Sequence, residues 1–182
     1  MIETAVDIQT LLRQAIDHHR AGRLRESEAA CRQALHVDPS QPTALNLLGT
    51  IARQAGRPDA AITLFRRAVA AAPDYADAYY NLGNALQAKG DRVGAIEAYD
   101  RALELRGDVA GWHNNRAVAL LAEGDAAWAE EGFRRAVALD PRYADAFNNL
   151  GNALLKQDRL GEAIAAYRQA LAVNPDFAGA LA

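Results

Sequence analysis

Cysteine and aromatic residues are both scarce in this sequence. Cys31 is the only cysteine among 182 residues, which excludes an intrachain disulfide and a cysteine-based zinc cluster. We expect Cys31 to pack as a small core residue, as buried free cysteines commonly do. Aromatic residues make up only 7% of the chain, so any core must be built mainly from small and aliphatic side chains.

The sequence also lacks long apolar runs and a strong positive charge. The formal net charge of −3 argues against bulk nucleic-acid binding and against a polybasic membrane patch. No apolar run approaches the roughly 18 residues that a membrane span needs. Residues 1–7 contain no basic stretch followed by an apolar run, as a secretory signal would. We therefore expect a cytoplasmic protein with no membrane and no nucleic-acid partner.

Catalytic motifs are missing as well. The chain has no glycine-rich phosphate loop, no His-Glu-x-x-His and no Gly-x-Ser-x-Gly. His18 and His19 are adjacent in a predicted helix, where they point about 100° apart and cannot chelate one metal. We expect a non-enzymatic protein with no metal and no cofactor.

What the sequence does contain is a repeat of 34 residues, which four sets of residues mark independently. The sets are Gly49, Gly83 and Gly151; Pro39, Pro73, Pro141 and Pro175; Ala68, Ala102, Ala136 and Ala170; and Phe65, Tyr99, Phe133 and Tyr167. Each repeat carries two helical patterns, shown in the third by Tyr79, Leu82 and Leu86 and then by Ala95, Tyr99 and Ala102. Gly90-Asp91 separates the two patterns, and pre-proline residues end the second helix in most repeats.

These residues resemble the tetratricopeptide repeat (TPR) family, with its aromatic–Leu–Gly, Ala, aromatic, Ala, Pro pattern. The resemblance implies an all-α fold, a right-handed superhelical solenoid of five helix-turn-helix repeats. We place the repeats at 8–41, 42–75, 76–109, 110–143 and 144–177. Residues 1–7 would be an N-terminal extension, and residues 178–182 the start of a truncated sixth helix.

The fourth repeat departs from the family pattern. Trp112 stands one place before the aromatic slot, which holds His113, and Arg116-Ala117 replaces Leu-Gly. One interpretation is a locally repacked joint with the indole inside. The other is a partly exposed Trp112 that anchors a partner, as aromatic hot spots do.

Asparagine is concentrated in the first helix of each repeat, although it is a mediocre helix former. Asn81, Asn115 and Asn149 share one slot, and Asn46, Asn114 and Asn148 share the slot before it, which Tyr80 fills in the third repeat. Asn84 and Asn152 lie one turn further on. A primary amide can bond to both the N–H and the C=O of a peptide backbone. We expect all nine side chains to form a peptide-binding groove in which Asn81, Asn115 and Asn149 have no obligatory partner within the protein.

This column resembles the asparagine ladder in the TPR region of O-linked N-acetylglucosamine transferase. The alternative is that the asparagines are ordinary TPR consensus and bond to adjacent helices or water. Three functions stay open: a scaffold that binds a peptide or protein segment, the N-terminal targeting region of a larger bacterial glycosyltransferase-like enzyme, and a self-assembling structural protein.

The last predicted helix raises the third possibility. Ile164, Tyr167 and Leu171 would be poorly covered because no complete helix follows them. TPR arrays resemble other solenoids in needing a polar capping element at the end. We therefore expect homo-oligomerisation through the C-terminal end, or packing against an adjoining domain.

Overall fold

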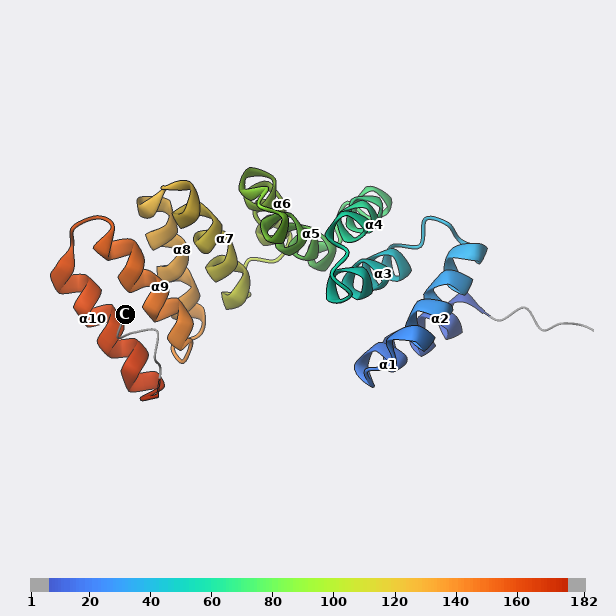
Figure 1. Cartoon of the computed structure of the whole chain (residues 1–182), viewed down its shortest axis with the longest axis horizontal. Helices are drawn as coiled ribbons and strands as arrows, with labels where there is room; N and C mark the ends of the chain where they lie inside the picture. Colours follow the sequence, from blue (N-terminus) through green and yellow to red (C-terminus); the bar gives the residue numbers. More distant parts are fainter. Residues whose placement is uncertain (1–6, 177–182) are drawn as a thin grey trace, which may run out of the picture. The chain divides into compact units, whose positions relative to one another are not determined.

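A computed structural model describes residues 7–176 of the chain, and these residues form helices and no strand. The ten helices shown in Figure 1 are α1 Ile8–Arg20, α2 Leu24–Val37, α3 Pro42–Gln54, α4 Pro58–Ala71, α5 Ala76–Lys89, α6 Arg92–Leu105, α7 Ala110–Glu123, α8 Ala126–Leu139, α9 Ala144–Leu155 and α10 Leu160–Val173. Odd-numbered helices, which we call A helices, begin every 34 residues, and each is followed by one B helix. The predicted all-α, five-repeat TPR fold is confirmed. The expected N-terminal extension and sixth helix lie almost wholly outside the described residues.

Tight turns join the A and B helices because each turn has one residue in the left-handed backbone region. Four of these residues are glycines, with φ of 71° at Gly22, 69° at Gly56, 86° at Gly90 and 99° at Gly124. Glycine adopts this conformation without a steric penalty. The fifth turn holds Asp158 at φ 58°, so the last repeat carries strain that the other four avoid.

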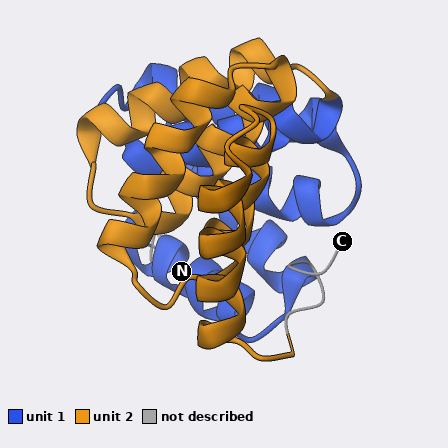
Figure 2. Cartoon of the chain, turned by 90° about the vertical axis from the view of Figure 1, so that its left-hand side faces the viewer, with its two compact units in different colours: residues 1–89 blue, residues 90–182 orange. Residues whose placement is uncertain are grey.

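The chain divides into two compact units, residues 1–89 and 90–182, which Figure 2 colours separately. In unit 1, α1 packs on α2 and α3 on α4, while α2 contacts α3 and α4 contacts α5. In unit 2, α7 packs on α8 and α9 on α10, while α6 contacts α7 and α8 contacts α9. Each helix therefore buries its apolar face mainly against its neighbours in sequence.

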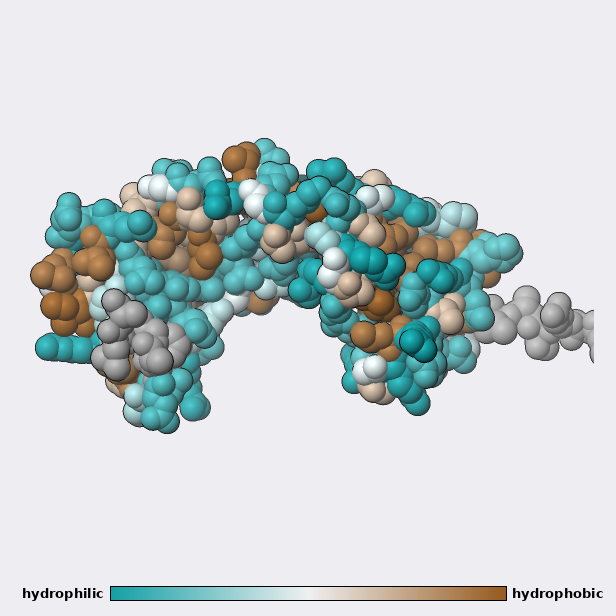
Figure 3. Space-filling view, viewed as in Figure 1, coloured by the Kyte–Doolittle hydropathy of each residue, from teal (hydrophilic) through white to brown (hydrophobic). Residues whose placement is uncertain are grey.

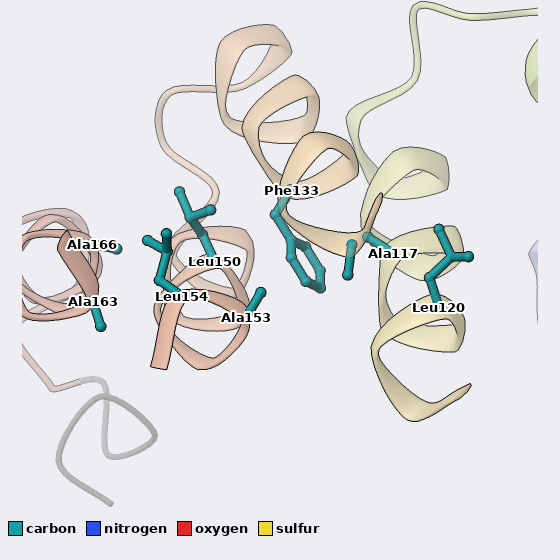
Figure 4. Packing of buried hydrophobic residues seen from close by; sticks show 9 residues of the cluster. Ala117, Leu120, Phe133, Leu150, Ala153, Leu154, Ala163 and Ala166 are labelled. Carbon is teal, nitrogen blue, oxygen red and sulfur yellow. The ribbon is translucent and has the colours of Figure 1, made fainter. Parts of the chain in front are cut away.

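Small residues allow the paired helices to approach closely. A Cβ atom on Gly49 would lie 2.6 Å from the ring of Phe65, which is fully buried on α4. In unit 2 the ring of Phe133 enters the space between α7 and α9, where Ala117, Leu150 and Ala153 surround it (Figure 4). In the second to fifth repeats one aromatic ring thus occupies this slot beside alanine and glycine, and in the first repeat buried Cys31 takes its place.

Candidate functional site

The A helices carry the predicted amide surface and lie side by side within each unit. In unit 1, α3 contacts both α1 and α5, and in unit 2, α7 contacts α9. Among the described helices, no comparable contact joins the B helices α2 and α4, or α8 and α10. Because the A helices are closer together than the B helices, the amides lie on the inner side of the curve in each unit.

In unit 1 the amides of neighbouring repeats are bonded to each other. The Nδ2 group of Asn81 on α5 donates to Oδ1 of Asn46 on α3, at 3.0 Å. The Nδ2 group of Asn46 in turn donates to the hydroxyl of Tyr75, at 3.2 Å. Both asparagines are half-buried. The bond from Asn81 ties the third repeat to the second, and the bond to Tyr75 holds Asn46 within the second repeat.

Unit 2 repeats this arrangement in the same register. The Nδ2 group of Asn149 on α9 donates to Oδ1 of Asn114 on α7, at 3.0 Å, across the same 35 residues. The Nδ2 group of Asn114 donates to Oδ1 of Asn115, at 3.3 Å. An asparagine in the later slot of one repeat therefore bonds to an asparagine in the earlier slot of the repeat before it.

The expectation that Asn81, Asn115 and Asn149 have no partner within the protein is wrong. A helices in contact bring the amides of successive repeats within hydrogen-bonding distance. Asn114 is only 6% exposed and bonds to Asn115 and Asn149, so its part in a groove is to hold these neighbours, and contact with a ligand stays a prediction. For Asn81 and Asn149, no group in residues 7–176 bonds to Oδ1, and each Nδ2 uses one of its two hydrogens.

The other predicted groove residues differ in their surroundings. Tyr80 and Asn84 are half-buried and interact with other groups of the protein. Asn152 is exposed and accepts a hydrogen bond of 2.8 Å from the hydroxyl of Tyr167. Asn148 is half-buried, and its Oδ1 atom is enclosed without a hydrogen-bond partner. An enclosed amide oxygen without a donor is unfavourable, and its position equals that of Asn46 and Asn114.

Trp112 follows the first of its two interpretations. Its side chain is 5% exposed, and the guanidinium of Arg106 lies 4.2 Å from the centre of its ring. This arrangement is a cation–π contact over a packed indole. The alternative of a partly exposed Trp112 that anchors a partner does not hold, since the indole is buried.

The exposed tryptophan is Trp128, which the sequence interpretation missed. It lies in the first turn of α8 and is 60% exposed. One signal could have revealed it: the same slot in the other repeats holds Glu26, Ala60, Gly94 and Glu162. A large aromatic residue is therefore unique to the fourth repeat at a slot that is otherwise small or polar.

Cys31 carries the only thiol in the sequence, and its surroundings determine its reactivity. Burial, opposed by a hydrogen bond from Ser27 and reinforced by the charge of Glu28, raises the pKa of the Cys31 thiol to about 12. That thiol is fully buried and stays protonated at neutral pH, so it serves as a core residue. Within residues 7–176, no three His, Cys, Asp or Glu side chains are grouped so that they could hold a metal ion. No helix in that range combines the length and apolarity needed to cross a membrane.

Paired helices repeated every 34 residues, with a bonded amide column along their A helices, define an α-helical solenoid protein. A family model described as tetratricopeptide repeat matches residues 12–76, 49–110 and 80–144, and a second matches residues 144–177. The chain therefore belongs to the tetratricopeptide repeat family. A comparison with curated proteins gave no match.

Several solved structures resemble this chain over most of its length. YrrB, described as a TPR protein with an unusual peptide-binding site, is 25% identical, with 98% of this chain and 92% of YrrB covered and a TM-score of 0.87. MamA is 23% identical, with 92% of each chain covered and a TM-score of 0.82. PilF of Pseudomonas aeruginosa is 19% identical, with 96% of this chain and 79% of PilF covered and a TM-score of 0.83. MamA and PilF support the fold alone.

Proposed function

We propose that this protein is a non-enzymatic scaffold that binds a peptide or protein segment along the inner, A-helix side of its repeats. The observation that carries the proposal is the unused hydrogen-bonding capacity of Asn81 and Asn149. Each side chain is held by one bond to the preceding repeat, and each keeps an acceptor and a donor that no described group uses. The resemblance to YrrB, described as a peptide-binding TPR protein, supports the same class of function.

The amide network would make these asparagines better binding groups than free side chains. A side chain that is already oriented loses less conformational entropy when a ligand binds. Oδ1 would accept from a peptide N–H, and the second Nδ2 hydrogen would donate to a peptide C=O. Helices pack ~8–10 Å apart and an extended chain rises ~3.3 Å per residue. Asn115 and Asn149, on neighbouring A helices of unit 2, would thus meet a peptide at roughly every third residue.

The test must separate peptide binding from protein stability, because Asn149 is proposed to contact the peptide and also bonds to the preceding repeat. Peptides selected from a random 12-residue display library on the whole protein serve as probes, and fluorescence polarisation measures their affinity. Asn149→Ala removes the binding amide and the inter-repeat bond together. Asn114→Ala removes the buried acceptor of the same inter-repeat bond and leaves the amide of Asn149 in place. It is therefore the matched control.

The proposal predicts different results for the two variants. Asn149→Ala should weaken a groove-bound peptide by roughly 2- to 12-fold for each hydrogen bond lost, the equivalent of about 0.5–1.5 kcal/mol. Asn114→Ala keeps the binding amide and removes only the bond that orients it, so it should weaken the peptide clearly less than Asn149→Ala does. Equal losses in the two variants would mean that the amides act only by holding the repeats together.

We propose in addition that the exposed face of α10 pairs with a second copy of the chain. Ile164 is 41% exposed, whereas Ile62, at the same repeat position, is 6% exposed because α5 packs on α4. Leu160, one turn earlier, is also exposed, and Figure 3 shows hydrophobic surface at the α10 end of unit 2. The enclosed Oδ1 of Asn148 on α9 is at the position that accepts from the next A helix in earlier repeats.

Sedimentation over a wide concentration range tests this pairing. Wild-type protein should show a concentration-dependent dimer that Ile164→Asp removes, because a charge cannot be buried at an apolar interface without a partner. Val37→Asp, at an exposed position of α2 in unit 1, is the control and should leave the dimer intact. Monomeric wild-type protein at all concentrations would rule the pairing out.

A further inference from the structure

Several of the residues at which the fourth repeat departs from the repeat pattern line one surface cavity of about 810 Å³. The cavity lies within unit 2, between the B helices α6 and α8, with α7 behind it. Arg116 from α7 and Trp128, Gly132 and Arg135 from α8 are among the residues that line it. It is on the opposite side of the repeats from the amide surface, because its walls are B helices.

Two of the lining residues depart from the repeat pattern. The slot of Arg116 holds Gln14, Leu48, Leu82 and Leu150 in the other repeats, and the slot of Gly132 holds Ala30, Leu64, Ala98 and Ala166. A Cβ on Gly132 would lie 2.9 Å from the Cβ of Ala117, so this glycine lets α8 approach α7 closely. One repeat further on, the corresponding cavity is lined by Leu150 and Ala166 and measures only about 240 Å³. The fourth repeat therefore has a much larger cavity than the fifth at the corresponding place.

The apolar part of the cavity centres on Trp128. This side chain is 60% exposed, and Leu103 and Ala138 contribute further apolar surface. Exposed tryptophans beside a depression are characteristic hot spots of peptide binding, because they bury a large area at a low cost in side-chain entropy. These groups suit a bulky apolar side chain of a ligand.

The polar part of the cavity offers guanidinium groups with unused donors. Arg116, whose side chain is 25% exposed, donates through Nε to Asp100, and no group in the described range bonds its terminal nitrogens. Arg135 has no ion-pair or hydrogen-bond partner in residues 7–176. Guanidinium groups in a partly enclosed site are suited to bind a carboxylate through two hydrogen bonds.

The acidic residues of the cavity limit how much negative charge it accepts. Asp100 is neutralised by Arg116, and Glu104 is paired with Arg101 at 2.5 Å. Glu131, one turn before Arg135, has no partner among the described residues and would repel a second carboxylate. One carboxylate beside an apolar group therefore fits the site better than a run of acidic residues.

We propose that this cavity is a second peptide-binding site, which takes a segment presenting a bulky apolar side chain next to a single carboxylate. The apolar side chain packs on Trp128, and the carboxylate binds Arg135 and the free edge of the Arg116 guanidinium. The site goes beyond the proposed amide surface, since it uses different helices and recognises side chains rather than peptide backbone.

The same 12-residue display library provides the probes for this site. Trp128→Ala and Arg135→Gln change exposed side chains, so both variants should keep the wild-type helical circular dichroism spectrum. Val93→Ala changes a similarly exposed apolar residue in the first turn of the preceding B helix, outside the residues that line the cavity, and is the matched control. Each recovered peptide is measured against all three variants and against Asn149→Ala.

The proposal expects a class of peptides with an aromatic or leucine residue adjacent to Asp or Glu. Trp128→Ala should weaken them at least about tenfold and Arg135→Gln about three- to tenfold, with Val93→Ala and Asn149→Ala unchanged. Replacing the peptide's Asp or Glu by its amide should abolish the effect of Arg135→Gln. Failure to recover such peptides, or recovery only of peptides insensitive to Trp128→Ala, would overturn this proposal. Peptides sensitive only to Asn149→Ala would overturn it while leaving the amide surface supported.

Discussion

The asparagines show how a residue with poor helix propensity can still stabilise a helical repeat. Asparagine costs up to about 0.7 kcal/mol relative to alanine in a helix. A hydrogen bond contributes a net stabilisation of about 0.5–1.5 kcal/mol. The bonds from Asn81 to Asn46 and from Asn149 to Asn114 thus offset the intrinsic cost. The two effects are similar in size, so the outcome depends on how deeply each partner is buried.

That dependence gives a prediction for Asn149→Ala and Asn81→Ala. Asn149→Ala leaves the Oδ1 atom of buried Asn114 without a donor, which costs about 1–3 kcal/mol. Asn81→Ala leaves the half-buried Asn46, whose oxygen can turn to water, so it should cost less than about 1 kcal/mol. Urea unfolding at neutral pH measures both. An Asn149→Ala protein at least as stable as wild type would contradict the role of the network.

Glu130 is the acidic residue whose surroundings most favour a pH effect on stability. Burial raises the pKa of this carboxyl, but hydrogen bonds from Gln157, Arg134 and Arg159 outweigh burial and hold the pKa below its ordinary value of 4.5. The carboxylate accepts at 2.9 Å from Arg134 Nε and from Gln157 Nε2. Since Gln157 and Arg159 belong to the turn before α10, this network joins the fourth and fifth repeats.

A lowered pKa in the folded protein fixes the sign of the pH dependence. The stabilisation is fully present above the pKa of the unfolded chain and is lost as the pH falls through the lower folded pKa. Glu130→Gln should therefore destabilise by about 1 kcal/mol at pH 7, and the difference from wild type should vanish in acid below that pKa. Urea titrations of both proteins at several pH values measure this. Glu97→Gln, at an exposed position of α6, is the control and should change stability little at any pH.

Among the structural elements, the A–B turns show a clear departure of one repeat from the pattern of the other four. Asp158 adopts φ 58° where four other turns use glycine. Asp158→Gly should stabilise the protein by about 0.5–1 kcal/mol, since relief of strain outweighs the greater freedom of glycine in the unfolded chain. Gly124→Asp, the reverse change at φ 99°, should destabilise. Thermal melts that place the two variants in the opposite order would refute the strain argument.

The crossing of paired helices gives a prediction opposite to helix propensity. Alanine exceeds glycine as a helix former by about 1 kcal/mol, but a Cβ at position 49 would lie 2.6 Å from the buried ring of Phe65. Gly49→Ala should therefore destabilise by about 1–3 kcal/mol through overpacking. Gly111→Ala is the control: its Cβ meets no atom within 4 Å, so it should be neutral or slightly stabilising. Urea midpoints of the two variants provide the comparison.

The sequence predicted the helices well and the site only in outline, for different physical reasons. Helix limits follow from local signals, such as Gly90 at a turn and Pro39 after a helix, which act within a few residues. The partner of Asn81 is set by the packing of A helices, which depends on residues far along the chain. Trp112 is 5% exposed beneath Arg106, whereas Trp128 is 60% exposed. This difference depends on the packing of the fourth repeat, which helical periodicity does not show.

At the scale of the whole molecule, the contacts connect each helix mainly to its nearest neighbours. Stability in such an array is close to a sum of repeat and interface contributions, so repeats can open separately. The division into units 1–89 and 90–182 agrees with this view, since each unit has its own buried clusters. A substitution in one buried cluster should therefore destabilise mainly the helices close to it in the chain.

Native-state hydrogen exchange of the whole protein measures this locality. Gly49→Ala should increase amide exchange most in α3 and α4, where Gly49 and Phe65 pack, and leave α9 and α10 close to wild type. Asn149→Ala should give the reverse distribution, since its bond joins α9 to α7. If either variant raised exchange equally in all ten helices, the array would unfold as one cooperative body, and the contacts between neighbouring repeats would be stronger than the repeats themselves.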